Sequence, residues 1–445
     1  MVDERHVTDG ELVADTAEQG ATQAPPMPAK PTIWKRMALV LGAMGPGIIA
    51  ASAGNDAGGI STYSTAGAEY GYQTLWMMFV MTFSFVVAQE IASRMGAVTG
   101  KGLAALIREK FGVRPTAGAM AALLVSAFAA GVANFAGIAA AFEMLGISRL
   151  VSVPIAGLAA WLLITRGSFK SVERVLLILS SVFIAYVVAA IMAKPDWGSV
   201  AAATFTPSVR PDVPFIMLTV ALVGTTIAPW MQFLVQTNVV ERGVDARGLG
   251  LMRVDVITGA ISANVVAWFI IITTGTVLFT AGVSIHDAKD AALALTPAVG
   301  PYATMLFGTG LAAASFLATC VIPLTGAYAV TEAFGWERGV DRSFSEAPGF
   351  HSIFTGLIVL SALFIMIPGA PLVTIMVLSQ AVNGILLPVL LVFQMKIVND
   401  RRIMGKHKNG KVANALGWTT TWVLFALTAV LMVGTLAQAL GLLPG

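Results

Sequence analysis

The sequence predicts an all-α integral membrane protein with eleven transmembrane helices. Of its 445 residues, 57% are hydrophobic and only 11% are charged, whereas about 25% of the residues of a typical soluble domain are charged. The apolar residues gather in blocks of roughly 18 or more with almost no charge, which is the length that an α-helix needs to cross a bilayer core. The chain lacks the many short alternating segments that are typical of a membrane β-barrel.

The charges between the eleven blocks predict how the chain is oriented. Of the 27 Lys and Arg residues, 23 fall in the N-terminal segment or in the loops after even-numbered blocks. The positive-inside rule therefore places the N-terminus in the cytoplasm and, because the number of spans is odd, the C-terminus on the extracytoplasmic side. We expect a multi-pass protein of the plasma (cell inner) membrane. The blocks cover residues 37–66, 74–97, 115–145, 147–165, 171–193, 213–240, 250–283, 299–333, 350–367, 371–397 and 415–438.

The segments outside the blocks are polar. Residues 1–33 are rich in Ala, Pro and acidic residues and lack an apolar core, so they predict a disordered cytoplasmic tail and not a signal peptide. The loop from Asn399 to Lys411 is the most basic stretch and is expected to anchor the cytoplasmic face. The net charge of only +3 argues against a nucleic-acid partner. The lipid bilayer is the expected partner, and the sequence carries no signal for an oligomeric state.

The first and sixth blocks contain interruptions that a purely structural helix does not need. The first contains Ser52-Ala53-Gly54-Asn55-Asp56-Ala57-Gly58-Gly59, a run of poor helix formers that is expected to unwind. The sixth contains Gly224-Thr225-Thr226-Ile227-Ala228-Pro229-Trp230, in which Pro229 removes an amide donor and leaves nearby carbonyls unpaired. Kinks that serve packing alone are the alternative explanation. Breaks at matched places in two sets of five helices instead indicate a substrate site between inverted repeats.

This symmetry divides the chain into four parts. After the tail of residues 1–33, the first five-helix repeat is expected over residues 34–200 and the second over residues 201–400. The basic loop and the eleventh helix then occupy residues 401–445.

Asp56 lies near the middle of the first block, where an unpaired carboxylate is costly to bury. No Lys or Arg lies at comparable depth in the other blocks, so a cation from solution is the expected partner. A carboxylate joined by the carbonyls of an unwound segment forms a hard-oxygen environment for a metal ion. The further polar candidates, each of which could instead serve a bond between helices, are Asn55, Thr225, Thr226, Gln232, Gln236, Asn238, Gln380 and Asn383.

These residues, and several stretches that follow one another in the same order and spacing, resemble the Nramp family of divalent-metal transporters. The stretches are Gly45-Pro46, Gln89-Glu90 through Lys101, Glu173-Arg174-Val175 with Pro195-Asp196-Trp197, and Leu378-Ser379-Gln380 through Gly405. The resemblance covers nearly all of residues 40–405. It implies a LeuT-like architecture of two inverted five-helix repeats plus one extra helix, built around a site for a transported ion.

The departures from the family pattern concern the metal ligands. Typical members carry Asp-Pro-Gly-Asn on the first helix, where this chain has Asp56-Ala57-Gly58-Gly59, and Met-Pro-His on the sixth, where it has Ala228-Pro229-Trp230. A thioether favours soft transition metals, and its loss enlarges the cavity for an ion that keeps some of its water. The pattern is similar to the Nramp-related magnesium transporter branch. The metal-site residues implied in this way are Asp56, Ala53, Asn55, Gly59, Thr225, Ala228, Gln236 and Gln380.

A second set of departures concerns protons. Most members carry an acidic pair on the third helix, where this chain has Asn134 and Gly137, and histidines on the sixth, where it has Trp230 and Val235. The histidines of this chain all lie outside the expected relay and are expected at the surface, and the single cysteine, Cys320, is expected to be a small packing residue. They are His6, His286, His351 and His407.

Three classes of transporter therefore stay open. The first is an uncoupled carrier of Mg²⁺, and of Mn²⁺, that alternates access around Asp56. The second is a proton-coupled Mn²⁺/Fe²⁺ symporter whose relay uses Glu90 or Glu143. A sodium-coupled carrier of an organic solute is the third, although Asp56 would repel a substrate carboxylate. No set of nucleophile, base and orienting group converges in the sequence, so neither an enzyme nor a resident cofactor is expected.

Overall fold

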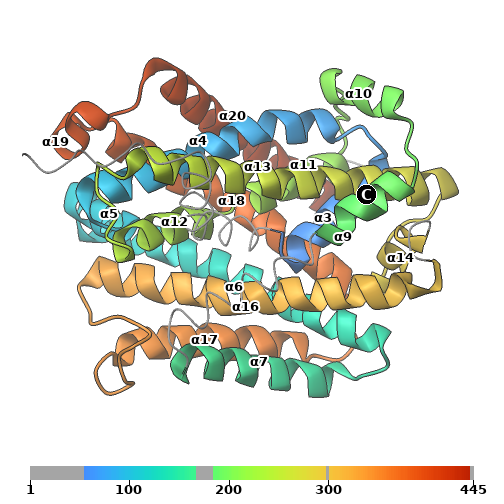
Figure 1. Cartoon of the computed structure of the whole chain (residues 1–445), viewed down its shortest axis with the longest axis horizontal. Coiled ribbons are helices and arrows are strands. Elements are labelled where there is room, and N and C mark those ends of the chain that lie inside the picture. The colour runs from blue at the N-terminus through green and yellow to red at the C-terminus, as the bar shows by residue number, and fades with distance from the viewer. Residues whose placement is uncertain (1–54, 167–183, 297–299, 441–445) are drawn as a thin grey trace, which may run out of the picture.

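The computed structural model describes residues 55–166, 184–296 and 300–440 of the chain. Every regular element in these ranges is a helix, and the long helices run side by side along the longest axis of the molecule (Figure 1). Nine helices, counting directly joined ones together, are long and apolar enough to cross a membrane in the described part of the chain. The all-α membrane fold that the sequence predicts is confirmed.

These nine helices match the predicted spans two to four and six to eleven. Spans one and five extend into residues outside the described ranges, and their described parts are α3 (Ala57–Tyr70) and α9 (Ile184–Met192). Nine of the eleven predicted transmembrane helices are therefore confirmed in the described ranges. The nine are α4 (Leu75–Thr99), α6 (Val113–Met144), α7 (Arg149–Arg166), α11 (Val213–Thr226) with α12 (Pro229–Glu241), α13 (Leu249–Thr274) with the π-turn η2 (Gly275–Phe279), η3 (Gly300–Tyr302) with α16 (Ala303–Phe334), α17 (Pro348–Ile365), α18 (Leu372–Val398) and α20 (Lys411–Ala439).

Short helices that the sequence analysis treated as loops lie at the two ends of the bundle. One end carries α10 (Trp197–Phe205) and α14 (Ala288–Leu293), and the other carries α5 (Leu103–Phe111) and α19 (Arg401–Met404) with η4 (Gly405–His407) (Figure 1). Side-chain caps start several of them. Asp196 accepts a hydrogen bond from the Gly198 amide at 3.1 Å, and Asp287 and Asp290 form a reciprocal capping box on α14.

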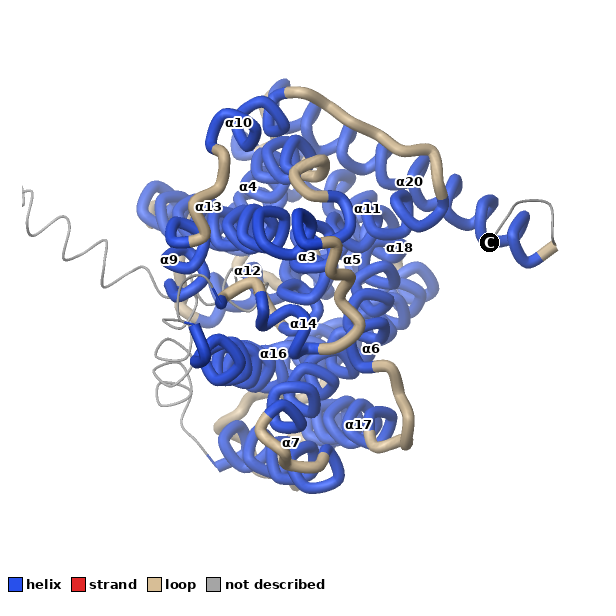
Figure 2. Tube along the Cα trace, turned by 90° about the vertical axis from the view of Figure 1, so that its right-hand side faces the viewer, coloured by secondary structure: helices blue, strands red, loops and turns tan. Residues whose placement is uncertain are grey.

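The helices differ in how much of their surface the protein covers. In the most apolar 18-residue stretch of each span, 78% of the residues are buried in the α11–α12 span. Only 28% are buried in α7 and 22% in α20. Viewed end-on, α7 and α20 lie at the outside of the bundle (Figure 2). The broken sixth span is therefore central, and α7 and α20 are the spans with most surface left for lipid.

The central helices α11 and α18 cross with their backbones in contact. A Cβ atom on Gly224 would lie 2.1 Å from the carbonyl oxygen of Gln380, and one on Gly384 would lie 2.2 Å from that of Val220. Both contacts are with backbone, which cannot rotate away as a side chain can. Glycine is therefore required at both positions of this crossing, which holds the broken helix against α18.

The expectation that all four histidines lie at the surface is wrong for His351. This residue lies in the first turn of α17 and is only 4% exposed. A ring nitrogen, Nε2, is 2.8 Å from the carbonyl oxygen of Arg342, and the ring stacks on Phe344. Its partner comes from the loop before α17, and the sequence carries no sign of that contact. His6 lies outside the described residues, and Cys320 is buried as expected.

Replacing Gly384 by Ala should destabilise the bundle, because the added methyl group collides with the Val220 carbonyl. We expect a loss of about 1–3 kcal/mol or more, seen as a lower midpoint of thermal unfolding in detergent. Gly356→Ala in α17 is the matched control, since its Cβ would meet nothing within 4 Å. Equal midpoints for the two variants would contradict the close crossing.

Candidate metal site

The described part of the first span begins at Asn55, and the next residue, Asp56, caps helix α3. Asp56 has an extended backbone, with φ −74° and ψ −177°, and its Oδ1 accepts a hydrogen bond from the Gly59 amide at 2.8 Å. The first amides of a helix have no partner within it, and a carboxylate satisfies them and the positive end of the helix dipole. The helix therefore starts where the sequence places the break. Ala53 lies outside the described residues.

The sixth span is broken as the sequence predicts. Helix α11 ends at Thr226 and α12 begins at Pro229, with Ile227 and Ala228 outside helical geometry between them. Pro229 has no amide hydrogen to donate to the carbonyl of Thr225. The negative end of the α11 dipole and its free carbonyls thus face this break, which favours a cation there.

Asp56 is buried, with 3% of its surface exposed, and its second carboxylate oxygen is held by a neutral side chain. Oδ2 accepts a hydrogen bond from Nδ2 of Asn134 on α6 at 2.9 Å, and Asn134 Oδ1 accepts one from the Ala57 amide at 3.2 Å. Among the described residues, no Lys or Arg side chain pairs with Asp56. The negative charge therefore has hydrogen-bond donors but no cationic side chain.

This role of Asn134 was not predicted, because in the sequence Asn134 stands out only as the replacement of an acid. A single carboxamide within an Ala-rich apolar helix was the available signal. Its bond to Asp56 could not be predicted, because the pattern gives the depth of a residue but not the helix that it faces.

Gln380 on α18 connects the two broken helices. A Cβ on Gly58 would lie 1.8 Å from its side-chain Nε2, and a Cβ on Gly224 would lie 2.1 Å from its carbonyl oxygen. Its Oε1 accepts a hydrogen bond from Asn383 at 2.9 Å. Gln380 therefore lies against both the first turn of α3 and the last turn of α11, as expected for a residue of the predicted site.

The two threonines that end α11 differ in their partners. Thr226 Oγ1 lies 3.1 Å from the Tyr63 hydroxyl and also donates to the Leu222 carbonyl. Thr225 is 2% exposed, and within the described part of the chain its hydroxyl oxygen has no hydrogen-bond partner. Buried polar atoms are rarely left unpaired, so Thr225 is available to a ligand or to water in the break.

Two predicted ligands have other partners. Asn55 donates from Nδ2 to the Ala263 carbonyl of α13 at 3.0 Å, although its Oδ1 is not used in that bond. Gln236 donates from Nε2 to the Lys101 carbonyl at 2.8 Å, in the turn between α4 and α5. Gln236 thus lies two turns along α12 from the break, and its buried Oε1 has no hydrogen-bond partner among the described residues.

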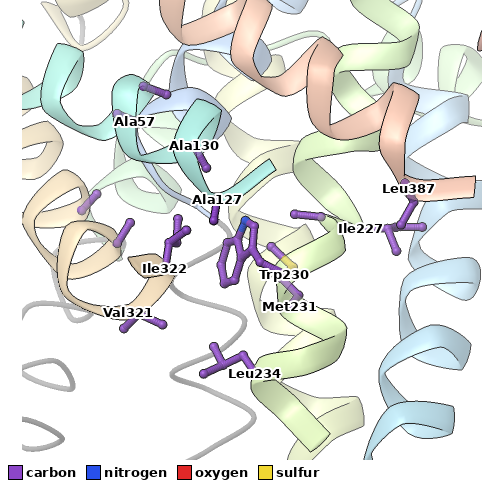
Figure 3. Close-up of a cluster of buried hydrophobic side chains, with 14 of the residues drawn as sticks. Ala57, Ala127, Ala130, Ile227, Trp230, Met231, Leu234, Val321, Ile322 and Leu387 are labelled. Carbon is purple, nitrogen blue, oxygen red and sulfur yellow. The ribbon is translucent and has the colours of Figure 1, made fainter. Parts of the chain in front are cut away.

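Tight packing surrounds Gly137, Trp230 and Val235, which stand where most family members carry proton-binding side chains. A Cβ on Gly137 would lie 2.3 Å from that of Ala57 and 2.4 Å from Ser315 Oγ, so no carboxylate fits there without displacement. The Trp230 side chain is 1% exposed and lies among Ala127, Ala130 and Ile322 (Figure 3). Val235 is also buried. Gly137 thus leaves no space for a carboxylate, and neither the indole of Trp230 nor the side chain of Val235 can accept a proton.

The two acids considered for a relay are engaged in ion pairs. Glu90 Oε1 lies 2.8 Å from Arg253 Nε, and Glu90 Oε2 lies 3.1 Å from Arg94 Nη2. Glu143 Oε1 lies 2.5 Å from Arg149 Nε. Glu143 lies in the last turn of α6, and Glu90 lies in the second half of α4.

The site therefore presents a buried carboxylate with amide, hydroxyl and backbone oxygens around two helix breaks. No cluster of three or more His, Cys, Asp or Glu side chains that could hold a metal exists in the described ranges. One carboxylate with neutral oxygens suits a hard cation that keeps part of its water shell. A substrate site between broken helices in a membrane bundle defines a transporter.

Comparisons with known proteins identify the family. A model of the Nramp, or natural resistance-associated macrophage protein-like, family matches residues 47–434. The divalent metal cation transporter MntH of Ralstonia nicotianae is 29% identical over 422 residues, which cover 89% of this chain and 90% of that protein. A solved manganese transporter of Eremococcus coleocola has a TM-score of 0.75 at 20% identity, covering 94% of this chain and 91% of that one. Mhp1, a nucleobase-cation-symport-1 family transporter, has a TM-score of 0.56 at 16% identity, and the match covers 88% of this chain and 92% of that one.

The chain belongs to the Nramp family. Its structural neighbours confirm the LeuT-like fold that the resemblance implied, and its relatives are membrane transporters and not enzymes. The repeat boundary at residue 200, the orientation of the termini and the individual ligands stay predictions.

Proposed function

We propose that this Nramp-family chain transports Mg²⁺, and Mn²⁺, as a partly hydrated ion by uncoupled alternating access around Asp56 in the plasma membrane. The observation that carries the proposal is the buried Asp56 carboxylate, which has no cationic side-chain partner in the described chain. The relatives named above as divalent metal cation and manganese transporters support a divalent cation as the substrate.

The choice of Mg²⁺ rests on the ligand types. Oxygen atoms predominate, and neither a thioether nor an imidazole stands at the sixth-span break, where the chain has Ala228 and Trp230. Magnesium prefers oxygen ligands and releases its water reluctantly. We assign Asp56, Thr225 and Gln380 to the site, with Gly59 and Ala228 supplying space and backbone, and Ala53 and Asn55 as further candidates.

The proposal of uncoupled transport rests on Asn134, which is hydrogen-bonded to Asp56, and on the ion pairs of Glu90 and Glu143. A carboxamide bound to Asp56 cannot take up a proton as a second carboxylate would. The alternative, a proton-coupled Mn²⁺/Fe²⁺ symporter, needs Glu90 or Glu143 as a relay, and both are already paired with arginines.

Asp56→Asn should reduce Mg²⁺ and Mn²⁺ uptake into vesicles to background, because a neutral side chain cannot offset a divalent charge at this depth. Asparagine is also a good helix cap, so the fold should survive. Asp212→Asn is the matched control, since Asp212 caps α11 through the Phe215 amide at 2.8 Å. Near-normal uptake by Asp56→Asn would remove the basis of the site.

Mg²⁺ at millimolar concentrations should compete with Mn²⁺ for uptake, because the site lacks a soft ligand that would discriminate between them. Ala228→Met together with Gly59→Asn should narrow the cavity and weaken Mg²⁺ relative to Mn²⁺, while Mn²⁺ uptake shows that the variant is folded. Wild-type Mn²⁺ uptake that ignores a large excess of Mg²⁺ would favour the symporter.

Metal influx should proceed without stoichiometric proton influx. The measurement is internal pH in proteoliposomes during an imposed Mg²⁺ or Mn²⁺ gradient, with the potential set by valinomycin. Internal pH should stay constant while metal accumulates, because the side-chain partner of Asp56 among the described residues, Asn134, cannot accept a proton. Acidification that scales with metal uptake and disappears in Asp56→Asn would establish coupling instead.

A further inference from the structure

The connection between α18 and α20 carries a group of free positive charges at one end of the bundle. We call its five Lys and Arg residues the basic segment. All five are exposed, and within the described chain no ion pair or side-chain hydrogen bond engages them. They are Arg401, Arg402, Lys406, Lys408 and Lys411.

The one acid beside the basic segment does not neutralise it. Asp400 Oδ2 lies 2.6 Å from Lys110 Nζ of α5, and its Oδ1 accepts a hydrogen bond from the Arg402 amide at 2.9 Å. The Lys110 hydrogen bond and the Arg402 amide hold the pKa of Asp400 below its usual range. Asp400 is therefore ionised but paired with a cation from another helix, and the five charges stay uncompensated.

The basic segment lies where a membrane surface would meet the protein. It joins two membrane-spanning helices, and α20 leaves most of its surface uncovered by protein. Val412, beside Lys411 in the first turn of α20, is 73% exposed. An exposed apolar side chain next to Lys and Arg residues is typical of the boundary between hydrocarbon and headgroups.

The segment is also fixed to the transporter core. Arg94 of α4 is 5% exposed and donates to the His407 carbonyl and, at 2.5 Å, to Asn409 Oδ1. The same guanidinium pairs with Glu90, which also binds Arg253 of α13. Helix α4 packs on α12, and α13 packs on α3. A ligand on the segment would thus brace the helices that support both broken spans.

We propose that the basic segment binds the headgroups of anionic phospholipids and that this binding stabilises the transporter. Anionic headgroups match five uncompensated cations at the membrane boundary, where each Lys or Arg contributes about 1 kcal/mol of attraction. This inference does not depend on the identity of the transported ion.

The test uses the full chain purified in detergent and titrated with phosphatidylglycerol, with the midpoint of thermal unfolding as the readout. The midpoint should rise to a plateau, and the rise should weaken in high salt. In Lys406→Gln/Lys408→Gln/Lys411→Gln, half of the rise should require a roughly 100-fold higher lipid concentration. These residues are exposed and are not among those assigned to the candidate metal site, so metal uptake by this variant in vesicles shows that it is folded.

A triple variant with the same charge change elsewhere is the control. Arg114→Gln/Arg247→Gln/Arg342→Gln also removes three exposed cations and should keep the wild-type response. An equal loss in the control would show general charge attraction and overturn the assignment. A wild-type response in the variant that lacks Lys406, Lys408 and Lys411 would also overturn the assignment. So would a rise in the midpoint with phosphatidylcholine or inorganic phosphate that equals the rise with phosphatidylglycerol.

Discussion

The buried negative charge of Asp56, which no Lys or Arg side chain among the described residues neutralises, is the constraint on which the site depends. Burying a carboxylate unpaired is costly, and hydrogen bonds offset only part of the cost. Asp56 receives one bond from the amide of Gly59 and one from Asn134. The start of α3 at this residue, the break of the sixth span and the neutral partner on α6 all become understandable if a cation completes the site.

The close approach of the backbones around this charge depends on glycines. Gly58 accommodates the Gln380 side chain, Gly137 accommodates Ala57, and Gly224 and Gly384 let α11 and α18 touch. Small residues permit such contacts in membrane bundles, where packing replaces the hydrophobic effect as the force between helices. Because these contacts involve the first turn of α3 and the last turn of α11, they set the distance between the two breaks.

The sequence could predict nine of the spans, the break of the sixth span and the start of a helix next to Asp56, because hydropathy and helix-breaking residues report depth and local geometry directly. It could not predict that Asn134 binds Asp56 or that Gln236 binds the Lys101 carbonyl. Those bonds depend on how each helix is rotated and which neighbour it meets. The burial of His351 was missed for the same reason, since its partner is a backbone carbonyl in a preceding loop.

The number of charges at the site also bears on how tightly it should hold its ion. A divalent cation beside Asp56 alone leaves a net positive charge in a region of low dielectric, which opposes complete loss of the water shell. Binding an ion that is present at about 1 mM requires only about 4 kcal/mol, whereas an ion at about 1 μM requires about 8 kcal/mol. A second carboxylate at position 134 would favour the tighter site, and Asn134 in its place fits weaker binding of an abundant, well-hydrated cation. The replacement of one acid by an amide would thus account for both parts of the proposal, uncoupled transport and a hydrated ion, through the same side chain.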